Sequence, residues 1–187
     1  MAKYVWSRCP GVTESRGQDG RTPLLQAIHI DNDEMAMALL DAKANIDAAD
    51  RLGNTALAWA AVRGNTTMAL ELLTRGAKVD VPNHFAETPL FRAVQGGFVE
   101  IVRALLARGA NANPRDTSDG ETALMSAARQ DDSAVVELLI AKGARPNDVD
   151  KEGMTAAHLA AQNAHADVLR ALAAGGADLR VRDKKGR

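Results

Sequence analysis

The stretch that decides the fold is DRLGNTALAWAAVRG, residues 50–64. Asp50 and Gly53 bracket a predicted tight turn, because glycine adopts positive φ angles without a Cβ penalty. Thr55 is a favourable N-cap for the short, alanine-rich helix that follows. Gly64 then interrupts the chain before a second amphipathic helix. The stretch therefore predicts a turn followed by two short helices.

The same pattern returns along most of the chain with a nearly constant period. A threonine followed by Pro or Ala recurs with spacings of 33, 33, 34 and 33 residues, at Thr22, Thr55, Thr88, Thr122 and Thr155. An apolar pair late in the second helix keeps the same spacings, at Leu39-Leu40, Leu72-Leu73, Leu105-Leu106, Leu139-Ile140 and Leu172-Ala173. A single unit would expose this apolar face, so neighbouring units must stack to cover it.

These residues resemble the ankyrin repeat. The matching stretches are DGRTPLLQAI (19–28), DRLGNTALAWAA (50–61), HFAETPLFRAV (84–94), SDGETALMSAA (118–128) and DKEGMTAAHLAA (150–161). The resemblance implies an all-α solenoid in which hairpin-like loops join helix–turn–helix units, with about five repeats and a truncated sixth. The repeats are expected at residues 17–49, 50–82, 83–115, 116–149, 150–182 and, in part, 183–187. Residues 1–16 are expected to form either an N-terminal cap or a partly disordered leader.

Three departures from the repeat pattern carry predictions of their own. Ala86 replaces the turn glycine of the third repeat, which costs about 1–2 kcal/mol if that turn keeps a positive φ. The fourth repeat has one extra residue within 116–120, so its hairpin tip should protrude or bulge. The final residues, 183–187, look like the start of a sixth repeat, which suggests that the sequence is part of a longer protein.

Composition narrows the classes of function. The 187 residues are 46% hydrophobic, too apolar for a disordered chain, and 23 basic against 24 acidic residues give a net charge of −1. A nucleic-acid binder usually shows a basic excess, so nucleic acid is not an expected partner. Cys9 is the only cysteine, and no long apolar run could insert in a membrane. We expect a soluble, cytoplasmic and monomeric protein.

The sequence carries no recognisable catalytic motif. No phosphate-binding glycine loop and no nucleophile elbow occurs, and the four histidines are distributed over three repeats. We interpret His158 and His165 as hydrogen-bonding repeat residues rather than metal ligands. No enzyme activity, cofactor or metal site is therefore predicted.

Residues that differ between repeats at the turn tips and inner-helix ends are candidates for contact with a partner. They are Arg51, Leu52, Asn54, Trp59, Arg63, His84, Phe85, Glu87, Gln95, Ser118, Asp119, Glu121, Arg129, Lys151 and Met154. Phe85 is the most informative, because an aromatic beside an aliphatic is typical of an interface anchor. The alternative is that Phe85 folds back over its own turn. Trp59 is equally compatible with the core and with the binding surface.

The leading functional hypothesis is a protein–protein interaction module that binds a protein partner through its concave face. A second hypothesis is that the array targets or regulates a larger protein such as an effector, channel or enzyme. A third is an inhibitor or immunity-type protein that blocks an enzyme. The sequence does not identify the partner.

Overall fold

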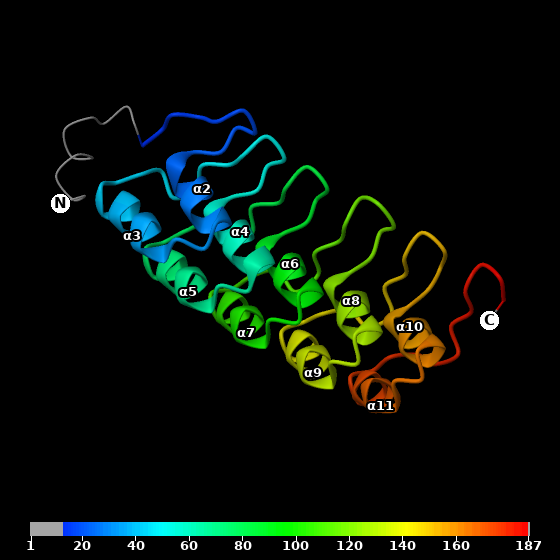
Figure 1. The fold of residues 1–187 in the computed structure, drawn as a ribbon. Helices are drawn as coiled ribbons and strands as arrows, with labels where there is room; N and C mark the ends of the chain where they lie inside the picture. Colours follow the sequence, from blue (N-terminus) through cyan, green and yellow to red (C-terminus); the bar gives the residue numbers. More distant parts are fainter. Residues whose placement is uncertain (1–12, 187) are drawn as a thin grey trace.

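The computed structural model describes residues 13–186, which form a single row of stacked helix pairs (Figure 1). The inner helices are α2 (Pro23–His29), α4 (Ala56–Arg63), α6 (Pro89–Gln95), α8 (Ala123–Arg129) and α10 (Ala156–Gln162). The outer helices are α3 (Asp33–Asp41), α5 (Thr66–Thr74), α7 (Val99–Ala107), α9 (Ser133–Ala141) and α11 (Ala166–Ala174). Hairpin-like loops project from the inner row on one side of the stack.

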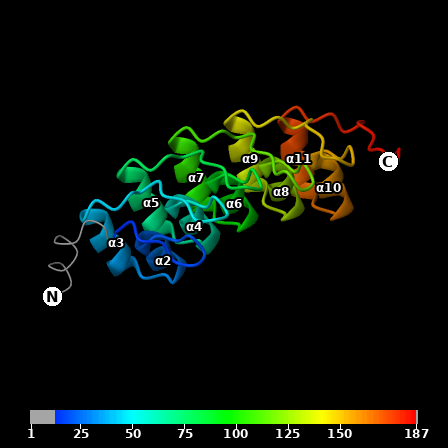
Figure 2. The same cartoon turned by 90° about the horizontal axis from the view of Figure 1, so that it is seen from above.

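One helix pair lies in each of the five ranges expected from the sequence, while the exact repeat boundaries stay a prediction. Each inner helix contacts the inner helix of the next repeat, and α5, α7, α9 and α11 contact one another in succession. Seen from above, the two rows step regularly along the stack (Figure 2). The all-α solenoid predicted from the repeats is confirmed. The expected cap or leader falls mostly on residues 1–12, outside the described residues.

The predicted threonine caps begin the inner helices. The hydroxyl oxygens of Thr22, Thr55, Thr88, Thr122 and Thr155 each accept a hydrogen bond from the backbone N–H three residues later. Each of these bonds satisfies one of the N–H groups that a helix start leaves unpaired. The recurring threonine therefore fixes where every inner helix starts.

The core runs continuously between the two rows of helices. The leucine pairs of the outer helices are buried, and Leu72 and Leu105 are 0% exposed. Phe91 is buried, whereas Phe98 is only half-buried and lies over Gly64 and Gly96. The core of the described residues thus consists mainly of alanine, leucine, valine, isoleucine and methionine, as the low aromatic content of the chain requires.

The hairpin loops end in tips that we call fingers 1 to 6. They comprise residues 17–20, 50–53, 83–86, 116–120, 150–153 and 183–186. In finger 2 the Asp50 carboxylate accepts hydrogen bonds from the N–H groups of Leu52 and Asn54, and Gly53 has a φ of 84°. In finger 3 Ala86 adopts a φ of 60°, which confirms that this turn keeps the left-handed conformation without a glycine.

The candidate protein-binding surface

Backbone hydrogen bonds join the fingers into one row. The second residue of each of fingers 2 to 6 donates its N–H to a carbonyl of the preceding finger at 2.9–3.1 Å. These bonds run from Arg51 to Asp19, from His84 to Leu52, from Thr117 to Phe85, from Lys151 to Asp119 and from Lys184 to Glu152. The tips are therefore held in register with one another, and they present their side chains as a continuous edge.

The extra residue of the fourth repeat forms a bulge in this row. In fingers 2, 3 and 5 the residue directly after the N–H donor gives its carbonyl to the following finger. In finger 4 the donor is Thr117 and the acceptor carbonyl belongs to Asp119, so Ser118 is left out of the series. The carbonyls of Thr117 and Ser118 instead accept hydrogen bonds from the Lys151 ammonium at 2.7 and 2.6 Å. The expected bulge is thus present, and a lysine of the next finger stabilises it.

Beside fingers 2 to 4 lies a depression of about 320 Å³, which we call the finger hollow. It is lined by Leu52, Asn54, Trp59, Val62, Asn83, Phe85, Glu87, Arg92 and Ser118. Leu52 and Phe85 lie at neighbouring tips and remain 50% and 47% exposed. The Phe85 side chain is therefore not buried against its own turn. Leu52 of repeat 2 and Phe85 of repeat 3 both border the finger hollow with large apolar side chains.

Trp59 packs partly against the hydrophobic core and also lines the finger hollow. Its indole N–H donates to the Asp50 carboxylate at 2.9 Å, and the Arg21 guanidinium lies 4.8 Å from the ring centre. The His29 ring meets it edge-on with the centres 4.7 Å apart. Burial lowers the pKa of His29, and the nearby charges of Arg21 and Arg63 lower it further. These contacts hold the half-buried indole in one orientation where it lines the hollow.

The polar floor of the hollow is fixed by internal hydrogen bonds. The Asn83 amide donates to Asn54 at 3.1 Å and to the Glu87 carboxylate at 2.7 Å. Glu87 also forms an ion pair with Arg92 at 3.1 Å, and Arg92 donates to Gln95 at 2.8 Å. These hydrogen bonds and the ion pair hold the side chains of the floor in fixed positions.

Several charged candidates are engaged within the protein. The Arg51 side chain lies against Gly20 of finger 1, and the His84 side chain lies against Gly53 of finger 2. Each of these two residues therefore covers the turn of the preceding finger. Arg63 pairs with Asp31 at 2.5 Å, a contact that crosses from repeat 2 to repeat 1. The pair is exposed, and such pairs contribute little stability.

The fourth repeat adds an acidic corner to the candidate surface. Glu121 pairs with Arg129 at 3.1 Å, and Asp119 is exposed at the tip of finger 4. Burial raises the pKa of Glu121; Arg129 opposes this shift, and Asp116, Asp119 and Asp150 add to it. Any cationic group that a partner brings to this corner would favour the ionised form of Glu121.

Two candidate residues are turned inward, which corrects the sequence interpretation. Asn54 and Met154 occupy equivalent positions between the turn and the threonine cap, and they are only 8% and 9% exposed. Both side chains are turned away from solvent, and Asn54 accepts a hydrogen bond from the Asn83 amide of the next repeat. Asn54 remains relevant as part of the hollow floor, whereas Met154 contacts Gln162 within its own repeat.

Sequence reasoning missed Asn83 and Arg92, which also line the hollow. Asn83 stands where the repeat pattern has an aspartate at the turn, and this difference in the sequence could have marked Asn83 as a candidate. The remaining candidates, Gln95, Ser118, Arg129 and Lys151, are exposed, although Lys151 is held over finger 4 by its hydrogen bonds. Ser118 lines the hollow, while Arg129 and Lys151 lie outside its lining.

The comparison with known families decides the identity of the repeat. A family model for ankyrin repeats, in three copies, matches residues 6–83, 70–150 and 90–183. The chain belongs to the ankyrin-repeat family. Ankyrin repeats are generally protein–protein interaction modules and typically lack catalytic activity. Comparison with curated proteins gave no significant match.

Two further properties of this ankyrin-repeat protein bear on its chemistry. Among the helices of residues 13–186, none has the length and apolar character of a membrane span. Within the same residues no three His, Cys, Asp or Glu side chains gather as metal ligands would. His158 hydrogen-bonds to Thr155, and His165 contacts the Ala128 carbonyl at 3.0 Å, so both act within the repeat framework.

Proposed function

We propose that this ankyrin-repeat protein binds a protein partner at the finger hollow, with Leu52 and Phe85 as the apolar anchors. The observation that carries the proposal is the pair of half-exposed apolar side chains at neighbouring tips beside a depression with an internally satisfied polar floor. Binding energy in protein interfaces concentrates in a few such anchors surrounded by polar groups.

The geometry favours an apolar side chain of the partner entering between the anchors. Val62 and the Trp59 ring supply further apolar contact, while Glu87 and Arg92 lie at the polar side of the hollow. Leu52 and Phe85 each give their backbone carbonyl to the next finger, so their positions are set by the hydrogen-bonded row. A preorganised surface of this kind loses little conformational entropy on binding.

The test compares three forms of the full chain: wild type, Phe85→Ala and Lys78→Ala. Immobilised wild type captures a partner, which mass spectrometry identifies and calorimetry then titrates against all three forms. We expect Phe85→Ala to weaken binding by about 2 kcal/mol, or roughly thirtyfold, with little change in melting temperature. Lys78→Ala should have almost no effect, because Lys78 lies in the linker after an outer helix. Equal affinities for wild type and Phe85→Ala would contradict the proposed site.

A further inference from the structure

The charge of the fingers changes along the row. Residues 17–21 and 50–54, in fingers 1 and 2, carry two acidic and two basic side chains. Residues 116–121 and 150–154, in fingers 4 and 5, carry five acidic side chains and one basic side chain. The chain as a whole has a net charge of −1, so fingers 4 and 5 are acidic against a nearly neutral background. A partner that crosses several fingers therefore meets a change of electrostatic potential between finger 2 and finger 4.

Finger 4 borders the finger hollow directly. Ser118 in this finger belongs to the lining of the hollow. Asn54 and Glu87, which also line it, each stand directly before a threonine cap, and Glu121 takes the same position in repeat 4. The row of residues along the floor of the hollow therefore continues into the acidic corner of the fourth repeat.

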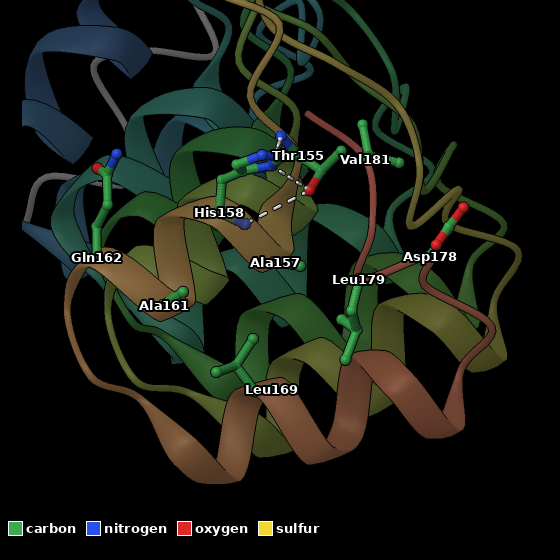
Figure 3. A pocket seen from close by; sticks show the side chains of 9 residues that line it. All are labelled: Thr155, Ala157, His158, Ala161, Gln162, Leu169, Asp178, Leu179 and Val181. Atoms are coloured by element: carbon green, nitrogen blue, oxygen red, sulfur yellow. Dashed lines mark hydrogen bonds between the residues drawn. The ribbon is translucent and has the colours of Figure 1, made fainter. Parts of the chain in front are cut away.

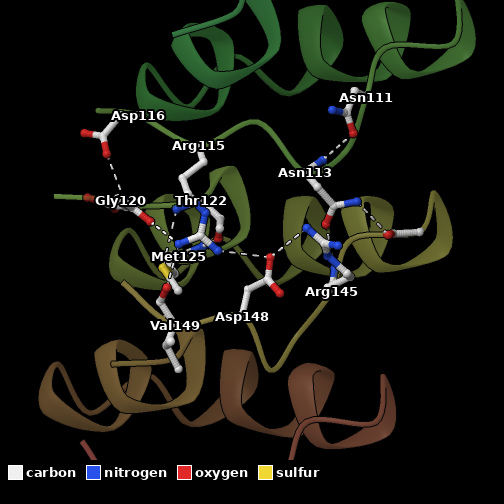
Figure 4. Close-up of polar contacts among 12 residues, drawn as sticks. Asn111, Asn113, Arg115, Asp116, Gly120, Thr122, Met125, Arg145, Asp148 and Val149 are labelled. Carbon is white, nitrogen blue, oxygen red and sulfur yellow. Dashed lines mark hydrogen bonds and ion pairs between the residues drawn. The ribbon is translucent and has the colours of Figure 1, made fainter. Parts of the chain in front are cut away.

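Arg115, the basic residue directly before finger 4, is held by groups of the protein itself. Its guanidinium donates to the carbonyls of Gly120 and Val149 at 2.8 and 2.6 Å (Figure 4). It also pairs with the Asp148 carboxylate at 3.2 Å. The charge of Arg115 is thus engaged by two carbonyls and a carboxylate of the next repeat's linker, and it joins repeats 4 and 5 instead of facing a partner.

The carboxylates of the acidic corner keep an excess of negative charge. Asp119 is exposed and forms no ion pair within residues 13–186. Glu121 has Arg129 as its ion-pair partner at 3.1 Å, while Asp116, Asp119 and Asp150 act on it as like charges. A further cation beside these carboxylates would reduce their mutual repulsion. The acidic corner therefore favours a positively charged group of a partner.

On the basis of the function proposed above, we propose that the partner segment at the finger hollow is a basic peptide. An apolar side chain of this segment enters between Leu52 and Phe85, and a lysine or arginine reaches Asp119 and Glu121. Neighbouring helices in a stack lie about 8–10 Å apart. An extended peptide covers this distance in about three residues, which sets the separation of the apolar and basic side chains.

The test uses the full chain and fluorescein-labelled peptides with leucine and phenylalanine as the apolar centre. One peptide carries two lysines about three residues from this centre, and otherwise identical peptides carry glutamine or glutamate instead of lysine. A fourth peptide keeps the lysines and replaces the apolar centre by serines. The charged residues precede the centre in one set and follow it in another, so that both chain directions are tested.

Fluorescence anisotropy measures the affinity of each peptide. In one of the two sets the lysine peptide should bind at least about tenfold more tightly than the glutamate and serine peptides, with the glutamine peptide between. Added salt should narrow the difference between the lysine and glutamate peptides, because it screens exposed charges.

Matched variants separate the apolar and the charged contacts. Phe85→Ala should weaken the lysine and glutamine peptides alike, whereas Asp119→Lys should reduce the preference for lysine over glutamate to less than about twofold. Glu137→Lys, an equal charge reversal at an exposed position of α9 in the same repeat, should leave this preference unchanged. Leu179→Ser should have no effect, since it removes an exposed apolar side chain from a separate depression of about 420 Å³ beside α10 and α11 (Figure 3).

Failure of the basic segment can be told apart from failure of the docking site. Weaker binding in Phe85→Ala together with an unchanged lysine preference in Asp119→Lys would overturn the basic segment and retain the finger hollow. Unchanged binding in Phe85→Ala would overturn the docking site itself. Lysine peptides that bind no more tightly than glutamate peptides, or do not bind, would also overturn the basic segment. Circular dichroism melts check that every variant is folded.

Discussion

Replacing Ala86 by glycine should stabilise the protein, although it removes a side chain. Ala86 has a φ of 60°, a conformation that costs an L-residue with a Cβ about 1–2 kcal/mol. Glycine removes this strain, but it also gives the unfolded chain more freedom, which costs about 0.4–1 kcal/mol. The difference predicts a net gain of about 0–1.6 kcal/mol in the free energy of unfolding, with a midpoint of about 0.8 kcal/mol.

The reverse substitution in the neighbouring finger is the matched control. Gly53 has a φ of 84°, and a Cβ there would lie 3.1 Å from the Asn83 Cα and 3.2 Å from the His84 nitrogen. These are backbone atoms of the next finger, so they cannot move aside as a flexible side chain could. Gly53→Ala should therefore destabilise the protein by about 1–2 kcal/mol, strain and crowding outweighing the entropic gain.

A second alanine allows the prediction to be repeated. Ala164 also has a φ of 60°, and it lies exposed between α10 and α11. Ala164→Gly should give a gain similar to that of Ala86→Gly, and the two gains should add because the sites lie in different repeats. Urea unfolding followed by circular dichroism measures these three variants and the double variant Ala86→Gly/Ala164→Gly, with unchanged m-values as the check on two-state behaviour. Losses of 0.5 kcal/mol or more in both alanine-to-glycine variants would refute the strain argument.

Two further predictions concern the core and the acidic corner. Leu105→Ala should cost about 2–5 kcal/mol in urea melts, because Leu105 is 0% exposed and its removal leaves a cavity; a change within about 0.5 kcal/mol would mean that α7 is not packed as described. The raised pKa of Glu121 means that the folded state holds this proton more tightly than the unfolded chain. Relative to Glu121→Gln, the wild type should lose stability as the pH rises from its ordinary pKa of 4.5 toward neutrality, and a parallel pH dependence in both proteins would contradict the shift.

The sequence predicted the framework well because the repeat encodes it locally. Thr55 and its equivalents cap helices through bonds to residues three positions away, so a short stretch determines each helix start. The alignment of Ala86 with the turn glycines of other repeats raised the question of a positive φ there, and the structure gives a φ of 60°. In each case the interaction lies within one repeat, and five copies of the pattern reinforced the inference.

The surface was less predictable because it depends on contacts between repeats. The hydrogen bonds from Lys151 to the carbonyls of finger 4 join residues 33 and 34 positions apart, and the bulge at Ser118 creates them. The orientation of Trp59 depends on Arg21 and His29 of the preceding repeat.

We expect side chains at the fingers to affect binding and side chains between the helices to affect folding stability. Phe85 is held by its backbone within the row of fingers while its side chain stays half-exposed, so truncating the side chain removes little buried area. Leu105, on the outer helix α7, is by contrast fully buried and does not line the finger hollow. Phe85→Ala should therefore change affinity with little loss of stability, and Leu105→Ala should change stability first. A variant pair that reversed this order would place the partner on the outer helices instead of the fingers.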